Sequence, residues 1–146
     1  MIPKFDPRGN LPPGIHWATW KEISVRFGTT AWRRQLLAGL LVALQSLKRA
    51  GCQTVYLDGS FVTDKPIPKD FDACWDPVGV DPTALDPVLL DIGDGRLTQK
   101  ARFLGELLPA KIRIGSDDLD FFYFFQTDKD TGCGKGIIAL DLGGVV

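Results

Sequence analysis

Apolar positions in the first third of the chain predict one long amphipathic helix. Between residues 31 and 50, leucines recur at spacings of three and four residues, the period of a helix with one apolar face; they are Leu36, Leu37, Leu40, Leu41, Leu44 and Leu47. Gly51 follows, where a glycine commonly ends a helix. Such a stripe is typical of a packing face, so we expect a core helix and no coiled coil.

A shorter helix is predicted just before it. Thr19 and Glu22 have the spacing of a capping box, in which each side chain satisfies a backbone donor near the other residue. This helix would run to about Phe27 and end at Gly28. Thr29 or Thr30 would then cap the long helix.

The arm that precedes these helices is predicted to be extended. Prolines and glycines interrupt residues Met1–Gly14 and exclude a helix there. Phe5, Leu11 and Ile15 are candidates for pinning the arm to the domain. His16 is the single histidine of the chain, and we expect it to pack or to hydrogen-bond rather than to catalyse.

Two strands with a turn between them follow the long helix. Residues Thr54–Leu57 are β-branched, aromatic or aliphatic, as in a buried strand, and lead into Gly59 and Ser60. Residues Asp70–Trp75 then begin with alternating acidic and apolar positions. On a strand, this alternation places the two aspartates on one face, roughly 6–7 Å apart at Cα.

The rest of the chain is predicted to be rich in loops before it returns to strand. Short helices are expected over Thr83–Leu90 and from a Thr98 cap to about Phe103, while Leu104–Lys111 fits either a helix or a strand. Late strands are expected over Leu119–Gln126 and Gly136–Leu142. The glycine-rich stretch between these two strands lacks the spacing of a phosphate-binding P-loop, so we interpret it as a turn.

The length and composition of the chain predict a single domain. The chain has 146 residues, of which 45% are hydrophobic and 24% charged, typical of a globular protein able to bury a core. The longest apolar run is far too short to span a membrane, and no signal peptide is visible, so no membrane partner is expected. Three cysteines without a CxxC spacing favour a reduced, cytoplasmic setting and argue against a zinc site.

Charge is distributed unevenly along the chain. The first 50 residues carry a net charge of +6 and the remainder −7, giving −1 overall. A basic third beside an acidic centre suits a polyanionic substrate that needs a cation at the reaction point. The competing interpretation is that these charges occupy solvated helix faces, and it carries slightly more weight.

The Gly-Ser turn and the acidic strand carry the candidate chemistry. A glycine lets the backbone approach a phosphate closely, and the Ser60 hydroxyl can donate to a phosphate oxygen. Asp70 and Asp72 can both reach one metal ion or a close pair, and a divalent cation would favour their ionised forms. Lys65 and Lys69 flank the expected phosphate position, although exposed lysines beside acids are usually only solvated.

Gly-Ser, nine residues and then Asp-Phe-Asp is similar to the signature of the nucleotidyltransferase superfamily with the DNA polymerase β-like catalytic core. Almost the whole chain also resembles a bacterial family of short nucleotidyltransferase-like proteins, many of them linked to toxin–antitoxin or defence pairs. The stretches that carry this second resemblance are Leu11–His16, Tyr56–Thr63, Phe124–Gln126 and Lys135–Leu142.

The resemblance implies an α+β fold, with a small mixed or antiparallel sheet and helices packed on one face. It also implies that Gly59, Ser60 and Lys65 contact a nucleoside triphosphate, while Asp70 and Asp72 bind Mg²⁺, with Mn²⁺ as the alternative. A third carboxylate on a later strand would complete the catalytic set with these two aspartates. Glu106 is ranked first for this role, and Asp120 and Asp141 stay open as alternatives.

The implied reaction transfers a nucleoside monophosphate to an RNA end, a protein hydroxyl or a small molecule, and nothing in the sequence selects among them. A cognate toxin or antitoxin is a further expected partner. Two other hypotheses stay open. An inactive protein of this fold could act as an antitoxin or nucleotide-binding regulator, or the chain could be a structural partner that binds through its arm and basic helix ends.

Overall fold

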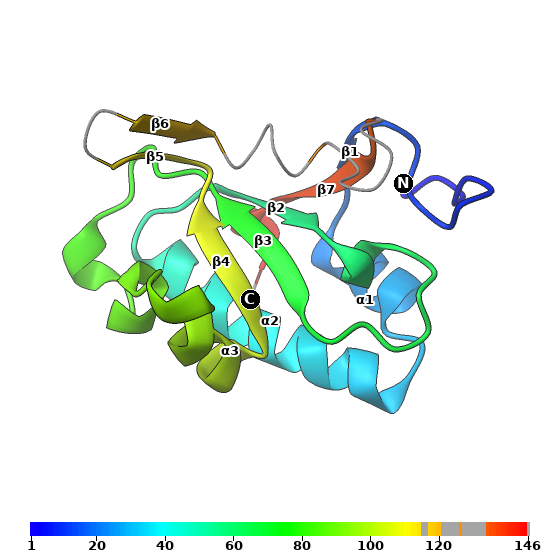
Figure 1. Ribbon diagram of the computed structural model, residues 1–146, viewed down its shortest axis with the longest axis horizontal. Coiled ribbons are helices and arrows are strands. Elements are labelled where there is room, and N and C mark those ends of the chain that lie inside the picture. Colours follow the sequence, from blue (N-terminus) through cyan, green and yellow to red (C-terminus); the bar gives the residue numbers. More distant parts are fainter. Residues whose placement is uncertain (115–116, 121–125, 127–133, 146) are drawn as a thin grey trace.

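The computed structural model describes residues 1–114, 117–120, 126 and 134–145, and it has an α+β fold (Figure 1). The α-helices within these residues are α1 (Trp20–Phe27), α2 (Ala31–Arg49) and α3 (Leu97–Phe103). The strands are β1 (Gly14–Trp17), β2 (Thr54–Asp58), β3 (Phe71–Trp75), β4 (Gly105–Pro109), β5 (Lys111–Ile114), β6 (Asp117–Asp120) and β7 (Gly136–Asp141).

Five of these strands form one mixed sheet in the order β1-β7-β2-β3-β4. β2 runs antiparallel to both of its neighbours, whereas the outer pairs, β1 with β7 and β3 with β4, are parallel. The three helices lie on one side of this sheet, and the β5–β6 ribbon lies on the other side (Figure 1). The expectation of a small mixed sheet with helices on one face is therefore confirmed.

The predicted leucine stripe is the core face of α2. Leu36, Leu40, Leu44 and Leu47 have no exposed surface, and each buried leucine contributes roughly 2 kcal/mol from removal of its apolar area from water. Gly39 lies on a side of α2 that meets the last turn of α3. A Cβ at this position would stand 1.9 Å from the carbonyl oxygen of Phe103, so the two helices approach too closely for any larger residue.

Both predicted helix starts are confirmed. Thr19 and Glu22 form the reciprocal hydrogen bonds of a capping box at the start of α1. Thr30, one of the two candidates, caps α2 by accepting a hydrogen bond from the backbone of Arg33. The helix ends at Arg49, and Gly51 follows with φ of +98°, in the left-handed region that favours glycine.

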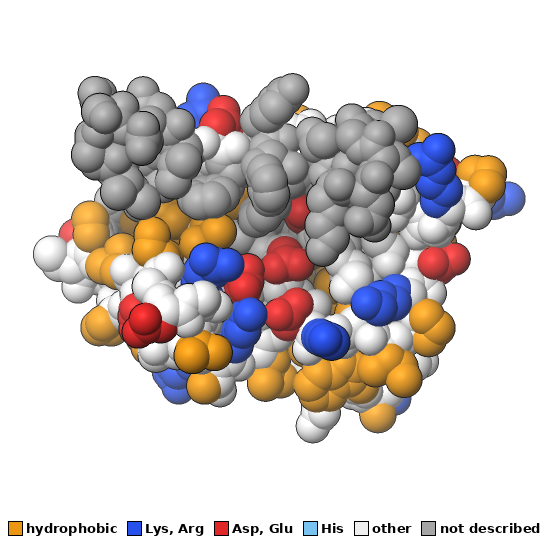
Figure 2. Space-filling view, in the orientation of Figure 1, with side chains coloured by type: hydrophobic (Ala, Val, Ile, Leu, Met, Phe, Trp, Pro, Cys, Tyr) orange, Lys and Arg blue, Asp and Glu red, His pale blue; other side chains and the backbone are white. Residues whose placement is uncertain are grey.

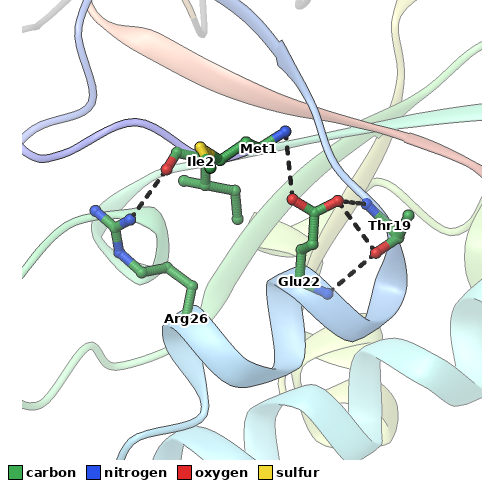
Figure 3. A network of polar contacts seen from close by, with 5 residues as sticks. All are labelled: Met1, Ile2, Thr19, Glu22 and Arg26. Carbon is green, nitrogen blue, oxygen red and sulfur yellow. Dashed lines mark hydrogen bonds and ion pairs between the residues drawn. The ribbon is translucent and has the colours of Figure 1, made fainter.

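The arm before α1 has no helix, as expected, but it is not extended throughout, because residues 6–10 form a hydrogen-bonded turn. The edge strand β1, which the sequence pattern did not predict, begins at its last residue, Gly14. Leu11 is buried and Phe5 packs on the core, whereas Ile15 is exposed. Arg26 of α1 donates hydrogen bonds to the carbonyls of Ile2 and Pro3 and stacks on Phe5. Figure 3 shows Glu22 and Arg26 on one face of α1, where they contact Met1 and Ile2 at the beginning of the arm.

Other expectations for the second half need correction. Pro82–Ala84 and Pro87–Leu90 form separate 3₁₀ turns instead of one helix, because Pro87 lacks the N–H that would continue the first turn. Thr98 lies inside α3 and does not cap it, since Arg96 occupies the cap position in a left-handed conformation. The ambiguous segment from Leu104 is a strand, β4.

Most of the strand expected over Leu119–Gln126, and most of the turn after it, lie outside the described residues. Within the described part, Asp120 ends β6, and the predicted strand from Gly136 is confirmed as β7.

Cys52 and Cys74 are buried free thiols. Burial raises the pKa of Cys52 to about 11. Among the described residues, no helix has the length and apolar character needed to cross a membrane.

Candidate active site

The Gly-Ser turn follows strand β2, and its backbone lies very close to the Asp72 side chain of the acidic strand β3. Gly59 adopts φ of +77°, and a Cβ at this position would stand 2.1 Å from Oδ2 of Asp72. Glycine is therefore needed for two reasons, its backbone conformation and the carboxylate that lies against it. Ser60 opens the short 3₁₀ turn Ser60–Val62, whose Phe61 fills the core.

Strand pairing brings three carboxyl groups into one row across the sheet. Asp58 at the end of β2 is paired in register with Asp72 of β3, which is in turn paired with Glu106 of β4. The residues that alternate with them, such as Leu57 and Leu107, belong to the core beneath the helices. The row therefore lies on the sheet face that the helices leave open, and Asp70 directly precedes β3 next to it.

Acidic side chains gather near the middle of the molecular surface in Figure 2, with lysine and arginine side chains on both sides of them. At the Glu106 end, Lys100 and Arg96 lie 3.0 and 3.4 Å from its carboxylate. At the other end, Lys135 Nζ lies 3.3 Å from Asp58 Oδ1, an ion pair that falls short of hydrogen-bond geometry.

Asp72, in the middle of the row, has a strongly perturbed carboxyl group. Its burial, together with repulsion from Asp70, Glu106 and Asp58, raises its pKa to about 7. In the part of the chain that the structure describes, neither Asp70 nor Asp72 forms an ion pair with a lysine or arginine. The centre of the row therefore lacks a paired cation among the described residues, and the raised pKa is the result.

The pKa values of the neighbouring acids Asp58 and Asp70 are also raised. Burial raises the pKa of Asp58, and Lys135 opposes this shift. Burial and the Glu106 charge also raise the pKa of Asp70, whereas Lys100, Lys69 and Lys65 lower it. A divalent cation bound here would relieve the repulsion between these carboxylates and favour their ionised forms.

The oxygen donors present fit Mg²⁺ or Mn²⁺, because hard carboxylate ligands are what such ions prefer. Asp70 and Asp72 are the residues that would hold the ion, and this assignment stays a prediction. Within the described residues, no three His, Cys, Asp or Glu side chains are already grouped as a metal site. Glu106 instead contacts Lys100 and Arg96, so its carboxylate is engaged by cations of the protein.

The three candidates for the third carboxylate occupy different places. Glu106 is the one that the fold brings beside Asp72. Asp120 lies in the separate β5–β6 ribbon, paired with Lys111. Asp141 ends β7 and accepts a hydrogen bond from the backbone of Gly143, as a turn-capping residue does.

Of the predicted phosphate contacts, Gly59 and Ser60 lie at the end of the row beside Asp58 and Asp72. The Lys65 side chain is exposed, close enough to influence Asp70. His16 has the structural role expected of it, since its Nε2 lies 2.7 Å from the carbonyl oxygen of Pro12.

Sequence reasoning missed four residues that line the row. Asp58 could have been found, because it alternates with Leu57 and directly precedes the glycine turn, which places it on the acidic face. Lys100, Arg96 and Lys135 carry no such signal. Each reaches the row through tertiary packing, from α3, from the turn before it and from the residue before β7, respectively.

Comparison with known proteins adds a family and no activity. No curated protein and no solved structure matches the chain. One family model, described as "Family of unknown function (DUF6932)", matches residues 3–141. This match includes every residue of the carboxylate row and the Gly-Ser turn, and on this basis the chain belongs to the family of unknown function DUF6932.

Proposed function

We propose that this protein is a divalent-metal-dependent nucleotidyltransferase. The observation that carries the proposal is the register of β2, β3 and β4, which sets Asp58, Asp72 and Glu106 side by side at the Gly-Ser turn. A central carboxyl group with a pKa raised to about 7 supports it, because a bound cation would remove the repulsion that raises this pKa. The Gly-Ser and Asp-Phe-Asp resemblance supports it independently.

In the proposed reaction, an acceptor hydroxyl attacks the α-phosphorus of a nucleoside triphosphate. The bond from this phosphorus to the bridging oxygen breaks, and pyrophosphate leaves with that oxygen. Glu106 accepts the hydroxyl proton. Gly59 and Ser60 hold the triphosphate, and Lys65 screens its charge. Bound Mg²⁺ or Mn²⁺ would neutralise charge that develops on the phosphate oxygens.

The acceptor is an RNA end, a protein hydroxyl or a small molecule, and we place the reaction in the cytoplasm, where Cys52 and Cys74 would stay reduced. A cognate toxin or antitoxin is the proposed protein partner. The second candidate is an inactive nucleotidyltransferase-like protein that acts as an antitoxin, a nucleotide-binding regulator or a structural partner. It is favoured by one observation, the engagement of Glu106 by Lys100 and Arg96.

Calorimetric titration with ATP, GTP, CTP and UTP in the presence of Mg²⁺ tests the proposal. We expect one of these nucleotides to bind and the Asp70→Asn/Asp72→Asn variant to lose this binding. Asp141→Asn is the matched control, because asparagine can still accept the hydrogen bond from Gly143. Absence of binding to any nucleotide, or equal binding by the double variant, contradicts the proposal.

A transfer assay then separates the enzyme from the inactive alternative. The protein is incubated with each radiolabelled nucleotide, Mg²⁺ and either total RNA or cell lysate, and incorporation of label is measured. We expect Glu106→Gln to retain nucleotide binding and to lose transfer, since it lacks the proton acceptor. Nucleotide binding without transfer to RNA, protein or small molecules would favour the inactive candidate.

A further inference from the structure

Arg33, in the first turn of α2, is a buried cation that contacts the loop between the Gly-Ser turn and β3. Only 3% of its surface is exposed. Its guanidinium donates hydrogen bonds to the carbonyl oxygens of Phe61, Thr63 and Lys65, at 2.8, 3.0 and 2.5 Å. A fourth bond of 3.3 Å reaches Phe27, at the end of α1. One side chain therefore ties three carbonyls of the loop to the helices.

This arrangement is unusual for an arginine because the charge has no ionic partner in contact. In the described ranges, Arg33 forms no ion pair with a carboxylate. Burial lowers its pKa, and the charge of Asp64 opposes this shift. A buried charge is costly unless it is fully hydrogen-bonded, and here the loop carbonyls supply those bonds. The loop conformation and the burial of the charge consequently depend on one another.

Two further contacts hold the same loop. The indole N–H of Trp32, the preceding residue, donates to the carbonyl of Pro68 at 2.6 Å. From the arm, the carbonyl of Gly9 accepts a hydrogen bond from the Asp64 backbone at 3.0 Å. The Gly9 backbone also lies close to the Asp64 side chain, since a Cβ at Gly9 would stand 2.0 Å from Oδ1 of Asp64. The loop is thus fastened along its length, with Arg33 at the part nearest Ser60.

We propose that Arg33 is a positioning residue that fixes the loop Ser60–Lys65 in the conformation that receives a polyphosphate. Its planar fork satisfies several carbonyls at once, which lysine cannot do with the same geometry. The buried guanidinium also places a positive charge behind the loop, where solvent ions screen it little. The effect on polyphosphate binding rests on the proposed function, whereas the effect on the loop does not.

Arg33→Lys is the variant of choice because it keeps the positive charge and loses the fork. Arg34→Lys is its matched control on the same helical turn, since Arg34 is exposed and donates to Gly28 instead of to the loop. Amide hydrogen exchange by NMR follows the N–H groups of Val62, Thr63 and Asp64, which are hydrogen-bonded within the loop or to the arm. Calorimetry measures the affinity for inorganic tripolyphosphate with Mg²⁺.

For Arg33→Lys, we expect the loop amides to exchange about tenfold or more faster, while the core amides of α2 keep their rates. Tripolyphosphate affinity should fall about tenfold or more. Arg34→Lys should change neither. If Arg33→Lys does not fold, Arg33→Gln, which is neutral and therefore leaves no unpaired buried charge, is measured in the same way and should also accelerate exchange selectively in the loop.

Unchanged loop exchange in the folded variant would overturn the proposal. Faster exchange with unchanged tripolyphosphate affinity would overturn the link between the loop conformation and the anion site. If the wild-type protein binds no tripolyphosphate, the proposed function fails, and exchange alone then decides whether Arg33 positions the loop. We expect loop protection and tripolyphosphate affinity to be retained in the wild type and in Arg34→Lys, both of which keep arginine at position 33.

Discussion

The raised pKa of Asp72 makes a prediction about stability that needs no substrate. Burial and the charges of Asp70, Glu106 and Asp58 raise this pKa from 3.8 to about 7 in the folded protein. The folded state therefore holds the proton more tightly than the unfolded chain does. Protonation of Asp72 stabilises the metal-free fold fully below about pH 4, and this stabilisation disappears as the pH rises through about 7.

The size of the effect follows from the shift. At about 1.4 kcal/mol for each pH unit, the full shift corresponds to at most about 4 kcal/mol, of which about 3 kcal/mol falls between pH 5 and pH 8. Asp72→Asn cannot ionise and lacks this contribution to the pH dependence. Lys100, Arg96 and Lys135, the cations around the row, are present in both proteins, so the comparison measures Asp72 together with its repulsion of the neighbouring acids.

Urea denaturation with a chelator, at a series of pH values between 5 and 8, measures the free energy of unfolding. We expect the wild-type protein to lose stability relative to Asp72→Asn as the pH rises, whereas the exposed Asp141→Asn should follow the wild type. Added Mg²⁺ should stabilise the wild type more at pH 8 than at pH 5, because the ion binds the ionised carboxylates. Parallel pH profiles for wild type and Asp72→Asn would refute the reasoning.

Substitution of either Gly59 or Gly39 by alanine is predicted to destabilise the protein. Gly59→Ala forces a side chain into φ of +77° and against Asp72, so denaturation should show a loss of about 2 kcal/mol or more, whereas Gly93→Ala, with nothing within 4 Å, should change stability little. Gly39→Ala should destabilise the protein even though alanine normally stabilises a helix by about 1 kcal/mol over glycine, because its Cβ meets the Phe103 carbonyl. A more stable Gly39→Ala protein in thermal unfolding would contradict the observed contact between α2 and α3.

The sequence was most informative where the determinants are local. Thr19 and Glu22 define the start of α1 by their spacing, and the leucine period defines the buried face of α2. The strand before Gly59 and the acidic strand were also predictable, because strand propensity and alternation are local signals. These elements account for Asp70 and Asp72 at the candidate site without knowledge of the tertiary fold.

The remainder of the site depends on contacts that are distant in sequence. Glu106 was one of three candidates for the third carboxylate, and only the parallel pairing of β3 with β4 shows that it lies opposite Asp72. Register of this kind is decided by the whole sheet and the helix α3 that connects the two strands. Arg33 lies in the first turn of α2, where a solvated charge is usual, yet it is buried and bonded to the loop carbonyls. No local pattern distinguishes it from its exposed neighbour Arg34.

The pairing of β1 with β7 has a consequence for the order in which the protein is completed. Gly14 lies opposite Gly136, so the first strand of the chain joins the sheet through the last one described. β1 therefore cannot pair in this sheet until β7 has been synthesised, whereas the beginning of the arm can already contact α1. The contact from Gly9 to Asp64 belongs to the same arm. That contact can form before β7 exists, so we expect the arm to join the molecule in two steps, first on α1 and the loop beside Ser60 and later, through β1, on the sheet.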